Sequence, residues 1–194
     1  MLSEIRKISS LLLSVAFSSI GFIASITVTV LAAREVSSNP LFVGFPNAVG
    51  VGGAVLGTRM IYLISKNNSQ LNALAFTFLI GAFGGAIMFY SLIVDSFVLL
   101  LFGAFILGIG QSATLQTRYA ASFVASEKFK ATALSLAVWF SVFGSVFGPR
   151  MVGSYSNFFE NIFNSELIVG YVIALVGMLF AASSLFIFTS KKSI

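Results

Sequence analysis

Six long apolar stretches, separated by short polar segments, limit how this chain can fold. Each contains 21 to 24 residues, and an α-helix needs about 20 residues to cross the roughly 30 Å hydrocarbon core of a bilayer. A barrel strand would need only about 10 residues of alternating polarity. The sequence therefore predicts an all-α integral membrane protein, a single bundle of six transmembrane helices over residues 1–194. The stretches are Leu11 to Leu31, Leu41 to Ile64, Leu71 to Val94, Phe97 to Thr117, Ala131 to Val152 and Leu167 to Phe188.

The distribution of lysine and arginine predicts the orientation of these helices. If the N-terminus is cytoplasmic, eight cations fall at the inner side and only Arg34 falls in an outer loop. Such an excess is the positive-inside bias of membrane proteins. We therefore expect a multi-pass protein of the plasma membrane with both termini in the cytoplasm. The eight inner cations are Arg6, Lys7, Lys66, Arg118, Lys128, Lys130, Lys191 and Lys192.

The residues that the chain lacks exclude several kinds of site. It has no Cys and no His, which leaves no disulfide, no thiolate chemistry and none of the usual zinc sites. No Asp or Glu lies inside an apolar stretch, so no buried carboxylate is available for a proton or a sodium ion. We expect no metal, no cofactor and no catalytic residue, and hence no enzyme. The cations lie on separate segments rather than on one face, which argues against a nucleic-acid partner.

An internal echo suggests that the chain contains two copies of one unit. Gly53-Ala-Val-Leu-Gly57-Thr-Arg59-Met60 returns as Gly144-Ser-Val-Phe-Gly148-Pro149-Arg150-Met151, with five identities in eight residues. The copies lie in the second and fifth stretches, which cross the membrane in opposite directions. An inverted repeat of three plus three helices would place them there, and such repeats are typical of transporters. We expect the first repeat at about residues 8–94 and the second at about 97–190.

Polar residues are concentrated in the first and fourth stretches. At membrane depth such side chains need partners within the bundle or a watery cavity. Serine and threonine can instead bond back to the preceding helical turn, and for these residues both interpretations stay open. The longer amides of Gln111 and Gln116 favour a cavity. The substrate-cavity candidates are Gln111, Gln116, Ser112, Thr114, Ser25 and Thr27.

A second group of residues is predicted to serve helix packing and gating. Small residues four apart let helices approach closely, and a proline removes a backbone donor. Arg59 and Arg150 lie near the ends of oppositely directed helices and so mark opposite faces of the membrane. The packing and gating candidates are Gly53, Gly57, Arg59, Gly144, Gly148, Pro149, Arg150 and Arg118.

The chain resembles the N-terminal six-helix half of a major facilitator superfamily transporter. Gly144-Ser-Val-Phe-Gly148-Pro149-Arg-Met-Val-Gly153 is similar to the fifth-helix motif GxxxGPxxGG of drug/proton antiporters. Glu127-Lys-Phe-Lys130 is similar to the charged inner turn before that helix, and Gly108-Ile-Gly110-Gln111 to the glycine part of the fourth-helix motif RxxQGxG. The resemblance implies a half of the major facilitator fold, with the first and fourth helices lining the cavity.

Two positions depart from the family motifs. Ala104 stands where the fourth-helix motif has the arginine that the family uses in proton transfer. In the loop after the second helix, which in the family carries a charge relay for gating, Ser65 replaces the motif aspartate and Asn68 a glycine. Arg118 is a candidate for a substitute cation, although it also fits a simple anchor at the inner face.

The resemblance implies a membrane transporter that moves a small molecule by alternating access. Because one bundle cannot enclose the central cavity, we expect a homodimer or a second six-helix half as partner, within a lipid bilayer. A structural or regulatory membrane subunit without transport activity is an alternative. A fragment of a full-length twelve-helix transporter is another.

Overall fold

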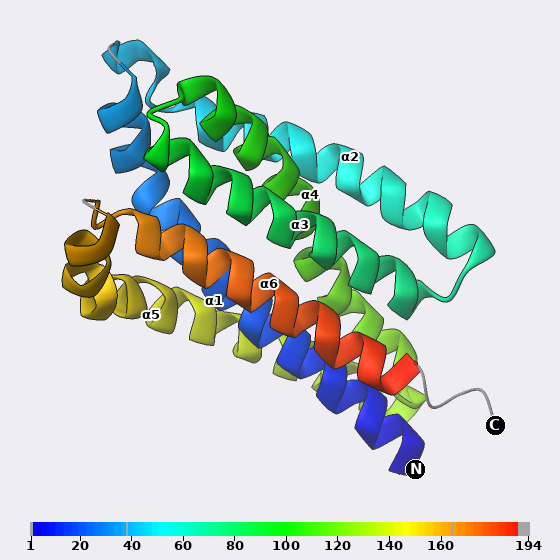
Figure 1. The fold of residues 1–194 in the computed structure, drawn as a ribbon. Coiled ribbons are helices and arrows are strands. Elements are labelled where there is room, and N and C mark those ends of the chain that lie inside the picture. The colour runs from blue at the N-terminus through cyan, green and yellow to red at the C-terminus, as the bar shows by residue number, and fades with distance from the viewer. Residues whose placement is uncertain (1, 38, 164, 190–194) are drawn as a thin grey trace.

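The computed structural model describes residues 2–37, 39–163 and 165–189, and these form a bundle of helices (Figure 1). Six helices are long and apolar enough to cross a membrane, and the described part of the chain contains no β-strand. The prediction of an all-α membrane protein with six spans is therefore confirmed. The long helices are α1 (Leu2–Val36), α2 (Phe45–Asn67), α3 (Gln70–Ile93), α4 (Phe97–Val124), α5 (Lys130–Phe163) and α6 (Ile168–Thr189). Two short 3₁₀ turns, Pro40–Phe42 and Glu127–Phe129, precede α2 and α5.

Polar side chains cap the helices that begin at tight turns. Ser69 accepts a hydrogen bond from the backbone N–H of Asn72 at the start of α3, and Ser96 accepts one from Leu99 at the start of α4. Each satisfies one of the four N–H groups that a helix leaves unpaired at its N-terminus. Only three residues join α3 to α4, and Asp95 among them adopts a positive φ of 49°. Adjacent helices are therefore antiparallel, and the start of α1 and the end of α6 lie at the same end of the bundle (Figure 1).

The end of the fifth helix differs from the prediction. The predicted apolar stretch ends at Val152, but α5 continues through Pro149 to Phe163 and includes the polar segment that follows Val152. Aromatic side chains explain the extension. Phe159 and Phe163 stack one helical turn apart, and Phe163 packs edge-on against Phe89 of α3 with ring centroids 5.4 Å apart. Such pairs stabilise a helix that hydropathy alone does not detect.

The helices do not pack in simple chain order. The most extensive contacts of α4 are with α3 and α2, and those of α1 are with α6 and α5, while α3 also packs along α6. Helix α2 barely touches α1, its neighbour in the sequence. If α1, α2 and α3 are matched with α4, α5 and α6, every major contact has a counterpart. This pattern is the one that the proposed inverted repeat requires.

Glycines permit the close packing of α2 against α4 and of α5 against α1. A Cβ at Gly53 of α2 would overlap the backbone of Phe105 on α4, and a Cβ at Gly57, one turn later, would overlap the backbone of Ile109. On α5, a Cβ at Gly144 would overlap Ser19 of α1. Gly148, one turn later, lies against Ala24 of the same helix. The two copies of the repeated glycine motif thus let α2 pack closely against α4, and α5 against α1, in the same way.

Burial is uneven among the six helices. In α1, α3, α4 and α6, 50% to 56% of the membrane-spanning segment is buried inside the bundle. The buried share is only 17% in α2 and 22% in α5. The core lies between the four well-buried helices and includes Phe78, Met88, Leu100, Tyr171 and Met178. Helices α2 and α5 therefore present most of their surface to lipid or to a partner.

Candidate functional site

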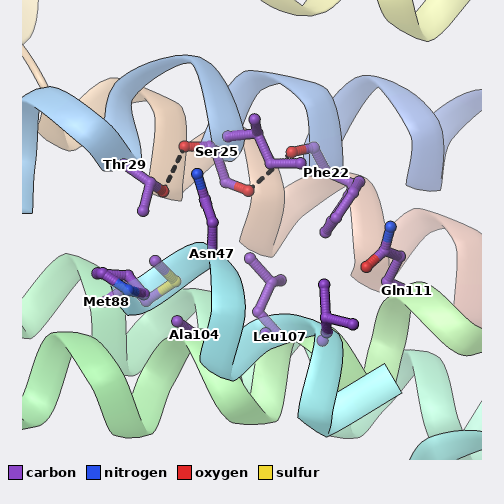
Figure 2. A pocket seen from close by; sticks show the side chains of 13 residues that line it. Phe22, Ser25, Thr29, Asn47, Met88, Ala104, Leu107 and Gln111 are labelled. Carbon is purple, nitrogen blue, oxygen red and sulfur yellow. Dashed lines mark hydrogen bonds between the residues drawn. The ribbon is translucent and has the colours of Figure 1, made fainter. Parts of the chain in front are cut away.

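A first cavity lies between α1, α2 and α4 and is named here the Asn47 cavity (Figure 2). Its volume is about 250 Å³. Figure 2 shows Asn47 of α2 directed toward Ser25 and Thr29 of α1, with Gln111 of α4 at the other end of the cavity. Apolar side chains such as Phe22, Met88 and Leu107 form most of the remaining wall.

The polar groups of the Asn47 cavity differ in whether they already donate a hydrogen bond within the protein. The Ser25 hydroxyl donates to the Phe22 carbonyl over 2.8 Å, and the Thr29 hydroxyl donates to the Ser25 carbonyl over 2.7 Å. These hydroxyls have used their single proton and can only accept a further hydrogen bond. The amides of Asn47 and Gln111 make no side-chain hydrogen bond to any residue that the structure describes. They are therefore free both to donate to and to accept from a ligand.

A second cavity lies between α1, α4 and α5 and is named here the Arg118 cavity. Its volume is about 270 Å³. Three of its polar atoms, Ser19 Oγ, Thr114 Oγ1 and Arg118 Nε, are buried without a hydrogen-bond partner in the described structure. Two serines of α5 complete the polar wall: Ser141, whose hydroxyl donates to the Val138 carbonyl, and the exposed Ser145.

The two cavities follow one face of α4. Each residue of α4 that lines them lies three or four positions from another such residue, which places the set in a single stripe along the helix. From Ala104 in the Asn47 cavity to Arg118 in the other, the helix rises about 21 Å at 1.5 Å per residue. Gln111 and Phe22 line both cavities and so lie between them. The α4 stripe is Ala104, Leu107, Gly108, Gln111, Thr114, Leu115 and Arg118.

Only some of the predicted cavity residues line one of the two cavities. Gln111, Ser25 and Thr114 line a cavity, as described above. The Ser112 hydroxyl donates to the Ile109 carbonyl over 2.7 Å and lies at the crossing with Gly57. Thr27 is exposed and donates to the Ile23 carbonyl over 2.8 Å. Gln116 is half-buried and lines neither of the two cavities.

Among the packing and gating candidates, the three arginines have different surroundings. Arg59 and Arg150 are exposed on α2 and α5, as is Pro149. Arg118 is half-buried and lines the cavity that bears its name. Only Arg118 is therefore in a position to meet a ligand inside the bundle.

Sequence reasoning did not select Asn47 or Ser19 as site residues. Asn47 is the one amide inside the second apolar stretch, and this isolated polar residue was a signal available in the sequence. Ser19 gave no such signal, because Ser18 lies beside it in the same polar run and both are buried. Their difference is that only Ser19 reaches a cavity.

Two proteins of Bacillus subtilis (strain 168) are similar to this chain. It is 30% identical over 175 residues to the "Uncharacterized MFS-type transporter YdeG", which covers 90% of this chain and 41% of that protein. It is 30% identical over 183 residues to the "Uncharacterized MFS-type transporter YddS", which covers 94% of this chain and 42% of that protein. The chain thus spans about two-fifths of the length of these relatives. No family model and no solved structure matches it.

Proposed function

We propose that this chain, a relative of major facilitator superfamily (MFS) transporters over 90% of its length, is a six-helix half of a transporter that moves a small molecule by alternating access. The two relatives confirm the family that the sequence predicts. The chain is a membrane protein of the MFS transporter kind. Its substrate, its mechanism and its assembly are the subject of the proposal.

One observation carries the proposal: two cavities that contain polar groups lie along the same face of α1 and α4 and share Gln111 and Phe22. Each cavity lies between these two helices and a third, α2 for the Asn47 cavity and α5 for the Arg118 cavity. A change in the tilt of α2 would widen or narrow the Asn47 cavity, and a change in the tilt of α5 would do the same to the Arg118 cavity. Alternating access requires such a pair of compartments on either side of a binding group.

The proposal also requires a second bundle. Polar side chains such as Asn47 and Gln111 are costly against lipid, so the face that carries them needs a cover. Helices α2 and α5 border this face and are the least buried of the six. A second copy of the chain about a two-fold axis would cover it, as would a separate six-helix half or the remainder of a longer chain. In this arrangement both termini lie in the cytoplasm and the protein resides in the plasma membrane.

Uptake into vesicles tests the proposed function. Proteoliposomes that contain the purified chain are incubated with a small-molecule cell extract, and the contents are compared by mass spectrometry with those of protein-free vesicles. We expect at least one compound to enter faster in the presence of the protein, and its entry to saturate with concentration. The native mass of the protein in nanodiscs gives the assembly. A monomer with no partner would remove the transporting dimer.

A second candidate function is a structural or regulatory membrane subunit. It is favoured by Ala104, which lines the Asn47 cavity at the position where the family motif has a functional arginine. It is also favoured by Ser65, at the position where the inner-loop motif has an aspartate, because a neutral hydroxyl, which here donates to the Tyr62 carbonyl, cannot join a charge relay. This alternative predicts a stable complex with a different membrane protein and no uptake by the purified chain.

A further inference from the structure

The Arg118 cavity contains polar groups that its own walls do not satisfy. Ser19 and Thr114 are each only 4% exposed, yet neither hydroxyl has a hydrogen-bond partner in the described structure, and neither does Arg118 Nε. Buried polar groups in folded proteins almost always have partners. The contrast within this chain is informative, because Thr29 and Thr117 are equally buried and both bond back to the preceding turn. The free groups therefore indicate space for a ligand that supplies the missing acceptor.

The geometry of the cavity brings the three groups together. Thr114 and Arg118 are one helical turn apart on α4 and so lie on the same face. Ser19 faces them from α1, at the crossing with Gly144 of α5. The three side chains converge from two helices on one cavity of about 270 Å³.

The charge of the cavity defines what can fill it. Arg118 is its only ionisable residue, and no carboxylate pairs with it within the part of the chain that the structure describes. Arginine carries five N–H donors and no acceptor, and its planar fork matches the two oxygens of a carboxylate or a phosphate. Serine and threonine hydroxyls can donate to the same oxygens. A donor set of this kind prefers an oxyanion to a neutral amide.

We propose that the Arg118 cavity binds an oxyanion, a carboxylate or a phosphate group, carried by the small-molecule substrate. The guanidinium of Arg118 is the charge partner, and the hydroxyls of Ser19 and Thr114 donate further hydrogen bonds to the anion. That the anion belongs to a transported substrate rests on the proposed function, whereas the anion site itself does not. This site adds a cation to the substrate-cavity candidates, all of which are neutral, and it gives Arg118 a binding role instead of an anchoring one.

Binding in detergent solution tests the site without requiring transport. The purified chain, in a neutral detergent at constant ionic strength, is titrated with benzoate, with inorganic phosphate and with benzamide, which has the shape of benzoate but no charge. We expect both anions, and not benzamide, to raise the unfolding temperature. Arg118→Gln should weaken benzoate binding by about 10- to 100-fold, as expected for loss of a charged hydrogen-bond partner. Lys128→Gln removes an exposed cation outside the cavity and should leave binding unchanged.

A substitution of Thr114 separates binding from a structural role. Thr114→Val keeps the shape of the side chain and removes the unpaired hydroxyl. Without ligand it should unfold at the same or a higher temperature, because no buried polar group is left unsatisfied. Its affinity for benzoate should nevertheless fall about tenfold, the effect of one lost hydrogen bond. A purely structural threonine would change stability and leave the affinity unaltered.

Three results would overturn the proposal. The first is equal stabilisation by benzoate and benzamide or by neither probe, and the second is unchanged anion binding in Arg118→Gln. The third comes from a lipid arm of the experiment: stabilisation by phosphatidylglycerol, but by neither soluble anion, would assign the cavity to a lipid headgroup. Anion binding that depends on Arg118, in a chain that shows no uptake of any compound, would keep the site and reject the proposed function.

Discussion

Replacing Gly53 with alanine is expected to lower the free energy of unfolding by at least about 2 kcal/mol, within the range of overpacked sites. The added Cβ would overlap the backbone of Phe105, which cannot move without displacing α4. Helix α2 would have to withdraw from α4, and the wall of the Asn47 cavity would open with it. The loss is measured by thermal or denaturant unfolding in detergent, followed by circular dichroism.

The neighbouring glycine provides a matched control. A Cβ at Gly52 would meet no atom within 4 Å, and alanine favours a helix over glycine by about 1 kcal/mol. Gly52→Ala should therefore leave stability unchanged or raise it slightly. If the inverted repeat holds, Gly144→Ala should be as damaging as Gly53→Ala, because it closes the equivalent crossing of α5 with α1 at Ser19. Equal stability of Gly53→Ala and Gly52→Ala would refute this account of the packing.

Gln111→Leu is expected to reduce uptake at least tenfold, which corresponds to about 1.4 kcal/mol in the transport barrier. Leucine has a similar volume, so the variant should fold. It removes the one amide that lines both cavities, and with it the polar contact that a substrate would keep while passing between them. Uptake by proteoliposomes of the compound found with the wild-type chain measures the loss.

Gln116→Leu makes the same chemical change on the same helix, but outside both cavities. Uptake by this variant should stay within about twofold of the wild type, a difference of less than 0.5 kcal/mol. An unchanged uptake profile in Gln111→Leu would remove Gln111 from the substrate path. Equal losses in both variants would mean that the amides act through stability rather than by contact with the substrate.

The helices were predictable from the sequence because the bilayer imposes their length and apolarity. The prediction was wrong at the end of α5, where hydropathy falls after Val152 but the helix continues to Phe163. That extension depends on contacts of Phe163 with Phe89, in a helix distant in the sequence. The hydropathy of a stretch of sequence contains no information on such contacts.

The cavity residues were only partly predictable, because a helical sequence does not say which face meets which neighbour. Gln111 and Gln116 are equally polar, but five residues turn a helix by about 500°, so their side chains point about 140° apart. Only one of them follows the stripe that α4 presents to the cavities. The same limit applies to Ser25 and Thr27 on α1, of which only Ser25 lines a cavity.

The most direct test of the transport mechanism uses the absence of cysteine from the chain. Single variants Asn47→Cys and Ser145→Cys place one thiol in each cavity, and a membrane-impermeant maleimide is applied from either side of oriented proteoliposomes. Alternating access predicts that the two thiols react from opposite sides, and that the transported compound changes the two labelling rates in opposite directions. Labelling of both thiols from the same side, or rates that the compound leaves unchanged, would contradict it.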